Sequence, residues 1–73
     1  MDLGTRVREG RRAHGLSQEG LAREVGVTMS TIQRVESGFI RDPHYSTLSG
    51  IATALGTTVA ELVGEEQRVP LAM

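Results

Sequence analysis

A single glycine, Gly26, separates two amphipathic runs in the stretch LSQEGLAREVGVTMSTIQRVESG, which occupies residues 16–38. Two helices joined by so short a connection cannot run antiparallel, so they must cross at a steep angle, about 90–120° in a helix-turn-helix. The turn needs a residue that tolerates positive φ, and glycine does so without steric cost. The spacing therefore predicts a helix-turn-helix at the centre of the chain.

The residue types on both runs fit this geometry. Ser17 and Thr28 are good N-cap residues, so a helix is expected to begin at each of them. Ala22 places a small side chain where the two helices should approach most closely. Apolar side chains are needed where the helices meet and where they dock, and these positions hold Leu21, Val25, Val27, Ile32 and Val35.

The rest of the chain also predicts helices, and no strand pattern occurs. Apolar periodicity predicts helices over residues 3–14 and 45–55, and another that starts at Thr58 with a capping-box spacing. Pro43 makes residues 39–44 a loop. Glycines suited to a left-handed helix end follow the runs at Gly15, Gly38, Gly56 and Gly64. Three glycines lie inside the predicted helices, and each should lower helix stability by about 1 kcal/mol relative to alanine: Gly10, Gly20 and Gly50. We expect an all-α, compact five-helix fold.

Length and composition predict one domain, residues 1–64, followed by a tail, residues 65–73, that is either disordered or docked on a partner. The 73 residues include no cysteine, no tryptophan, one tyrosine and one phenylalanine, so the core must be aliphatic. No apolar run reaches the roughly 20 residues of a membrane span, and the N-terminus lacks a signal-peptide pattern. The chain is therefore expected to be cytoplasmic, without membrane contact.

Charge favours nucleic-acid binding only in its distribution. The net charge is −1, but residues 1–44 hold seven arginines against six acids, whereas residues 45–73 hold one arginine against three acids. All eight residues of the lysine and arginine type are arginines, and arginine is a better bidentate partner than lysine for phosphate and base edges.

The quoted stretch, together with ALGTTVAEL near the end, resembles the phage-repressor (Cro and XRE) type of helix-turn-helix DNA-binding domain, from Val7 to about Leu62. The resemblance implies a lambda-repressor-like domain that binds a near-palindromic double-stranded DNA operator as a homodimer. The helix over residues 28–37 would enter the major groove, and the helix over residues 17–25 would cross the backbone.

The helix over residues 28–37 would be the reading helix, which contacts the bases. Four of its side chains should project from the face opposite Ile32 and Val35. Arg34 offers a fork suited to guanine, and Gln33 could bind adenine in the same way. Met29 can make only apolar contact, most plausibly with a thymine methyl, whereas Ser30 can donate or accept. The alternative is a solvated polar face, which the surrounding motif disfavours.

Contacts to phosphate are expected at the edges of this surface. Ser17 and Gln18 begin a helix whose free N–H groups favour an anion, although Ser17 also suits a simple cap. After the reading helix, the resemblance places Ser37, Arg41 and His44 against phosphates. The sequence departs from the family pattern at Asp42 and at Phe39 and Ile40, which could pack on a partner or on sugar rims.

The resemblance also implies an ion pair between Arg11 and Glu36 that turns Arg11 toward a phosphate. Two exposed charges would be the simpler alternative. The dimer interface is expected at Val59, Val63, Val69 and Leu71, with a core valine and a frayed tail as the alternative.

No nucleophile–base pair, metal cluster or phosphate-binding glycine loop occurs, so we expect no enzyme, cofactor, metal or small-molecule ligand. The leading hypothesis is a transcriptional regulator, with repression expected, such as a phage-type repressor or a restriction-modification controller protein. One alternative is an antitoxin that represses its own operon and binds a toxin. Another is a helix-turn-helix scaffold used only for protein–protein interaction.

Overall fold

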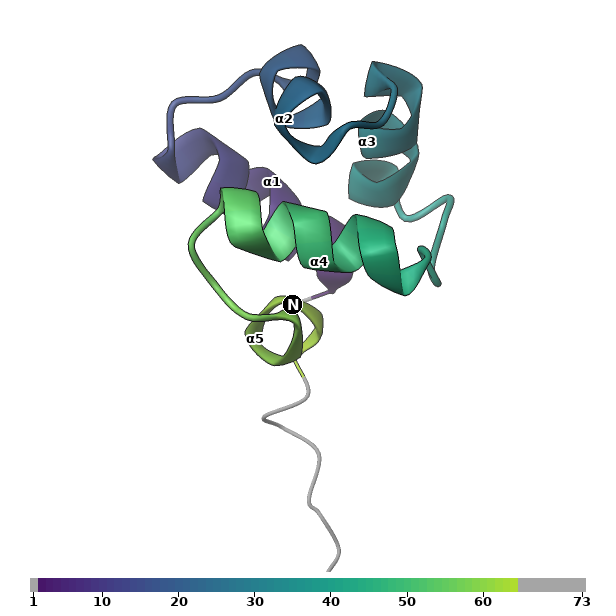
Figure 1. Ribbon diagram of the computed structural model, residues 1–73. Coiled ribbons are helices and arrows are strands. Elements are labelled where there is room, and N and C mark those ends of the chain that lie inside the picture. The colour runs from purple at the N-terminus through teal and green to yellow at the C-terminus, as the bar shows by residue number, and fades with distance from the viewer. Residues whose placement is uncertain (1, 65–73) are drawn as a thin grey trace, which may run out of the picture.

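The computed structural model describes residues 2–64, which form five helices (Figure 1). The helices are α1 Leu3–Ala13, α2 Gln18–Val25, α3 Met29–Ser37, α4 Tyr45–Ala54 and α5 Val59–Val63. The expected all-α, five-helix fold is confirmed, and the helix ends agree with the sequence prediction to about one residue. Residues 65–73, with Val69 and Leu71, lie outside the described residues.

Side-chain caps explain where most of the helices begin. Ser17, Thr28 and Thr58 each accept a hydrogen bond from the backbone N–H three residues later. Asp2 caps α1 in the same way, accepting from the Thr5 N–H, which the sequence analysis did not anticipate. The predicted capping box at α5 is only half formed, because the Glu61 carboxylate accepts from the Thr57 hydroxyl.

The core is aliphatic, as expected, and every helix contributes to it. Leu21, Ile32, Ile51, Val7 and Val35 are the largest fully buried side chains. Helix α3 packs against α2 and α1, α4 packs against α2, and α5 closes the other end against α1 and α4 (Figure 1). The three-residue connection between α2 and α3 turns at Gly26, whose φ is +88°. This packing places α2 and α3 together at one end of the molecule.

Close packing explains why Gly50 lies inside α4. A Cβ added at Gly50 would lie 2.9 Å from Cγ1 of Val25, so α2 and α4 are too close for a larger residue. The low helix propensity of this glycine is therefore offset by closer contact between the helices.

In the part of the chain that the structure describes, no helix has the length and apolar character needed to cross a membrane.

Candidate nucleic-acid interface

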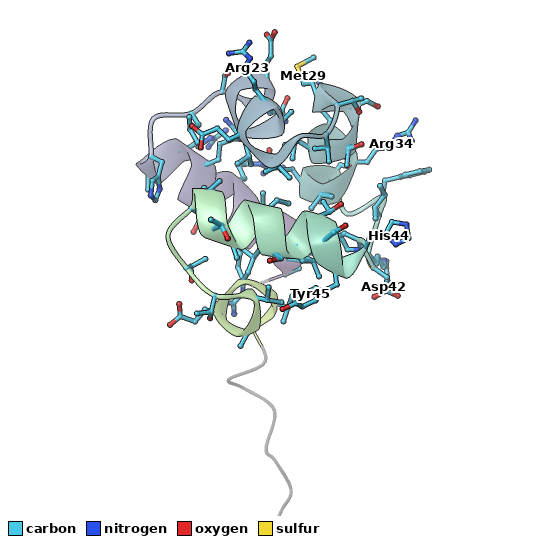
Figure 2. All side chains as sticks on the ribbon, in the orientation of Figure 1. Arg23, Met29, Arg34, Asp42, His44 and Tyr45 are labelled. Atoms are coloured by element: carbon cyan, nitrogen blue, oxygen red, sulfur yellow. The ribbon has the colours of Figure 1, made fainter. Side chains whose placement is uncertain are left out.

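One face of α3 is docked in the core and the other is open. Ile32 and Val35 are 0% and 1% exposed, respectively. The four predicted base contacts, Met29, Ser30, Gln33 and Arg34, are all exposed. Met29 projects outward from the start of the helix, and Arg34 projects outward farther along it (Figure 2). The structure thus brings these four side chains onto one rigidly held surface.

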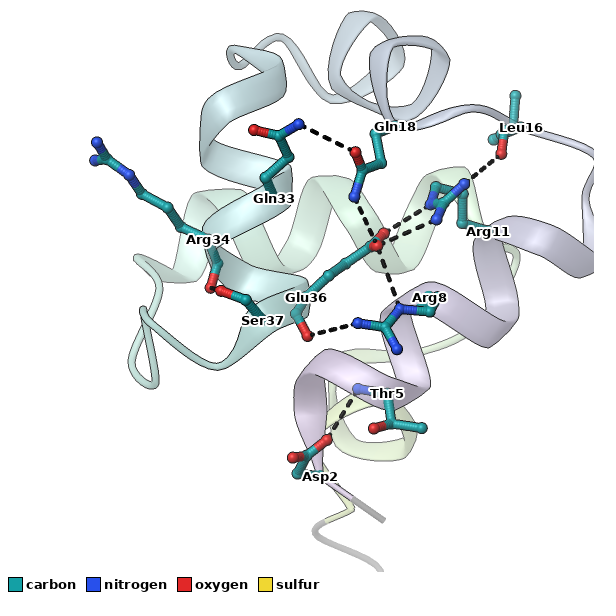
Figure 3. A network of polar contacts seen from close by, with 10 residues as sticks. All are labelled: Asp2, Thr5, Arg8, Arg11, Leu16, Gln18, Gln33, Arg34, Glu36 and Ser37. Carbon is teal, nitrogen blue, oxygen red and sulfur yellow. Dashed lines mark hydrogen bonds and ion pairs between the residues drawn. The ribbon is translucent and has the colours of Figure 1, made fainter.

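Behind this surface, Arg11 of α1 and Glu36 of α3 form a buried ion pair (Figure 3). Arg11 Nε donates to Glu36 Oε2 at 2.7 Å, and Arg11 Nη2 donates to Glu36 Oε1 at 3.1 Å. The side chains are 10% and 1% exposed. Because the carboxylate is covered by cations, it does not present negative charge at the surface.

The predicted phosphate contact of Arg11 does not fit this arrangement. Its third nitrogen, Nη1, donates to the backbone oxygen of Leu16 at 2.9 Å, so all three nitrogens already have acceptors within the protein. A guanidinium held in this way ties α1 to α3, and with its side chain only 10% exposed it presents little surface to a phosphate. We therefore leave Arg11 out of the proposed contact surface.

Gln18 connects the buried pair to the exposed face of α3 (Figure 3). Its Nε2 donates to Glu36 Oε1 at 3.1 Å, and its Oε1 accepts from Gln33 Nε2 at 3.3 Å. The chain of contacts fixes the orientation of the Gln18 amide between α2 and α3. The sequence indicated the surface role of Gln18 but not this link.

Arg8 is a second cation beside Glu36 that the sequence analysis missed. Its Nη2 donates to the Glu36 backbone oxygen at 3.3 Å, and its Nε lies 3.7 Å from Glu36 Oε1. Arg8 and Arg11 lie three residues apart on α1, which puts them on neighbouring turns of the same helix face. That spacing was the signal that could have identified Arg8.

Burial raises the pKa of the Glu36 carboxyl, but hydrogen bonds from Arg11 and Gln18 and the charges of Arg11 and Arg8 outweigh it. The net pKa of Glu36 lies below its ordinary value of 4.5. At the other end of α1, the hydrogen bonds from Thr5 lower the pKa of Asp2 as well. The ionised carboxylates of Glu36 and Asp2 therefore both stabilise the folded state.

Stability should fall in acid for this reason. A carboxyl whose pKa is lowered in the folded state contributes fully to stability when the pH is above its unfolded-state pKa. That contribution is lost as the pH falls through the folded-state pKa. We expect the free energy of unfolding to decrease below about pH 4.5, measured by urea denaturation from pH 7 to pH 3. Asp2→Asn keeps an N-cap but removes the Asp2 titration. A loss that disappears in this variant would contradict the role given to Glu36.

The predicted phosphate contacts other than Arg11 come from the start of α2, the end of α3 and the loop that follows it. Ser17, Ser37, Arg41 and His44 are exposed, and Gln18 is half-buried. The Ser17 hydroxyl caps α2 by accepting from the Gly20 N–H, whereas the Ser37 hydroxyl donates to the Arg34 backbone oxygen. Arg41 and His44 lie in the loop and at its end, beside the exposed Asp42.

The sequence left two roles open for Phe39 and Ile40, and the structure places the two side chains in different surroundings. Ile40 packs against the core. Phe39 is 78% exposed, and Cζ of Arg34 lies 5.8 Å from its ring centroid, within cation–π range. The aromatic ring therefore belongs to the same surface as Arg34.

Two other parts of the site prediction concern metals and the dimer interface. Within residues 2–64, no group of three or more His, Asp or Glu side chains is placed to hold a metal ion. Val59 and Val63 of α5 are half-buried, and Val59 packs against the core.

The chain belongs to the helix-turn-helix family of the Cro/C1 type, a class of DNA-binding transcriptional regulators; the family model, described as "Helix-turn-helix", matches residues 7–62. Solved structures of several regulators are similar to it.

The restriction-modification controller protein C.AhdI from Aeromonas hydrophila is 42% identical, with a TM-score of 0.76, over 82% of this chain and 89% of that one. The P22 c2 repressor, solved in complex with a synthetic operator, is 25% identical, with a TM-score of 0.82, over 86% and 94%. The clp gene regulator ClgR from Corynebacterium glutamicum is 27% identical, with a TM-score of 0.75, over 82% and 63%. The chain therefore spans less than two thirds of ClgR.

Proposed function

We propose that this protein is a transcriptional regulator that binds a near-palindromic DNA operator as a homodimer and acts mainly as a repressor. The observation that carries the proposal is the face of α3, where Gln33 and Arg34 are exposed on a helix held by the buried Ile32 and Val35. An α-helix fits the major groove, and a rigid one can present its donors to base edges in a fixed register. The similarity to regulators solved with operator DNA supports this proposal.

In this proposal, Arg34 donates to O6 and N7 of a guanine and Gln33 pairs with an adenine, while Met29 and Ser30 contact neighbouring base edges. Ser17, Gln18, Ser37, Arg41 and His44 bind the phosphates that flank these bases, which sets the register without reading sequence. Arg11 acts indirectly, by holding Glu36 and through it Gln18.

A homodimer would place two α3 helices about 34 Å apart, in successive major grooves on one face of the duplex. We propose that α5 forms the interface with Val59 and Val63, because it lies at the end of the molecule away from α2 and α3 (Figure 1). Occupancy would then follow protein concentration through dimerisation. We propose a cytoplasmic protein without enzymatic activity.

Selection of bound sequences from random duplex DNA tests the proposal. The expected result is a two-fold symmetric consensus whose half-sites are one helical turn apart. An asymmetric consensus would contradict binding as a symmetric homodimer, and the absence of any enriched sequence would contradict the function itself.

The net charge of −1 and the exposed Asp42 favour a second candidate function, a helix-turn-helix scaffold that binds only another protein. A salt titration separates the two. DNA binding predicts an affinity that falls steeply with salt, because each neutralised phosphate releases a counterion. A protein-only scaffold would show no DNA affinity at any salt concentration.

Arg34→Ala should weaken binding to the selected duplex by about 1–3 kcal/mol, a factor of roughly 5–150, and should relax the preference for one base pair. The physical reason is the loss of a bidentate contact to guanine. Fluorescence anisotropy against duplexes with each substitution at that position measures both effects. The control is Arg12→Ala, which removes an exposed arginine of α1. If both variants weakened all duplexes equally, Arg34 would contact phosphate and not a base.

A further inference from the structure

Phe39 is an exposed aromatic residue whose ring lies next to Arg34. It follows Gly38, which ends α3 in the left-handed conformation. Phe39 is 78% exposed, compared with 71% for Tyr45 and 44% for Met29, the other exposed large apolar side chains of the described region. A single exposed ring is common on protein surfaces, but this one lies against Arg34 on the proposed DNA-binding face.

The backbone around Phe39 is fixed on both sides. The Ile40 N–H donates to the Arg34 backbone oxygen at 3.1 Å, and the Ser37 hydroxyl donates to the same oxygen at 3.2 Å. The Phe39 N–H donates to the Ser37 hydroxyl at 3.4 Å. Because Ile40 is anchored in the core, the loop cannot withdraw Phe39 without breaking these contacts.

Arg34 and Phe39 form one continuous surface. The guanidinium carbon of Arg34 lies over the Phe39 ring, 5.8 Å from its centroid. Gln33, Arg34, Ser37 and Phe39 together line a shallow hollow. A molecule that binds Arg34 therefore also meets the ring, and the stacking limits the directions in which the guanidinium can point.

We infer that Phe39 is a specificity-determining residue, and that its ring contacts the C5-methyl group of a thymine adjacent to the guanine bound by Arg34. This rests on the proposed function. The thymine methyl is the apolar feature that base edges present in the major groove, and phenylalanine is suited to contact it. Arg34 and Phe39 then read two neighbouring base pairs as a unit.

The experiment uses the duplex selected from random DNA by the wild-type protein. Each thymine is replaced in turn by deoxyuridine, which removes only the methyl group. At one position in each half-site, beside the guanine recognised through Arg34, the replacement should weaken binding of the wild type about fourfold, the value of one buried methyl. Phe39→Ala should lower affinity for the unmodified duplex by a similar factor and should no longer respond to the replacement.

Two variants serve as controls. Phe39→Tyr keeps the ring and should keep the response to deoxyuridine. Tyr45→Ala removes a ring of similar exposure from α4 and should also keep it. Thermal melting of Phe39→Ala should match the wild type, because the removed side chain is exposed.

Three outcomes would overturn the inference while leaving the proposed function intact. One is a loss in Phe39→Ala that is equal for methylated and unmethylated duplexes, which would place the ring on the sugar–phosphate rim. Another is a consensus with no thymine beside the guanine. The third is a change of oligomeric state in Phe39→Ala, which would assign the ring to a protein interface. The absence of any selected sequence would overturn the proposed function and the inference together.

Discussion

Replacing Gly4 with alanine should destabilise the domain by about 3 kcal/mol, the upper part of the range for overpacking. A Cβ at this position would lie 2.4 Å from the backbone oxygen of Glu36 and 2.7 Å from that of Val35. Neither atom can rotate away, because both belong to the last turn of α3. Helix α1 or α3 must therefore move, which disturbs the side chains that both helices bury in the core.

Thermal unfolding measures the effect, which for a domain of this size corresponds to a decrease in Tm of roughly 12–24 °C. Gly10→Ala is the matched control on the same helix. Its Cβ would lie 2.9 Å from Cδ1 of Leu55, the end of a side chain that can adjust. The gain in helix propensity offsets that adjustment, so we expect a change within about 1 kcal/mol. If Gly4→Ala and Gly10→Ala lowered Tm equally, α1 and α3 could move apart at little cost in free energy.

Gly4 also shows what the sequence could not predict about the fold. The order and ends of the helices follow from local features: capping residues, apolar periodicity and glycines after each run. Contacts between helices are not local, and nothing in the sequence around Gly4 indicates that the backbone of α3 passes beside it. The sequence suggested that Gly10 and Gly50 only weaken their helices. In the structure both lie where a neighbouring side chain leaves little room for a Cβ.

The candidate site was predictable to a similar degree. The helical period of α3 separates Ile32 and Val35 from the side chains on its exposed face, so that face could be identified from spacing alone. Of the partners of Glu36, which come from two other helices, only Arg11 was predicted, and that prediction came from the family resemblance and not from spacing. The spacing of Arg8 and Arg11 places both on one face of α1, but it does not show that Gln18 of α2 reaches the same carboxylate or that Arg11 Nη1 donates to the Leu16 backbone oxygen.

The buried carboxylate is the basis of the second large effect. Glu36→Gln should destabilise the fold by about 3–5 kcal/mol, because the buried guanidinium of Arg11 then loses its counter-charge. Arg8, 3.7 Å from the same carboxylate in the wild type, would add to the uncompensated positive charge. The cost is measured as the change in free energy of unfolding by urea denaturation.

Glu19→Gln makes the same chemical change in a pair that is exposed. The Glu19–Arg23 side chains are 70% and 75% exposed, so the loss should stay within about 1 kcal/mol.

Replacing both Arg11 and Glu36 by methionine should be less harmful than Glu36→Gln alone, because no buried charge is left without a partner. If the double variant were as unstable as the single one, the loss would come from packing and not from charge. The double variant also removes the acceptor of Gln18, and with it the link to Gln33. A stable double variant that bound DNA less selectively would therefore show that the ion pair serves recognition through Gln18, in addition to holding α1 against α3.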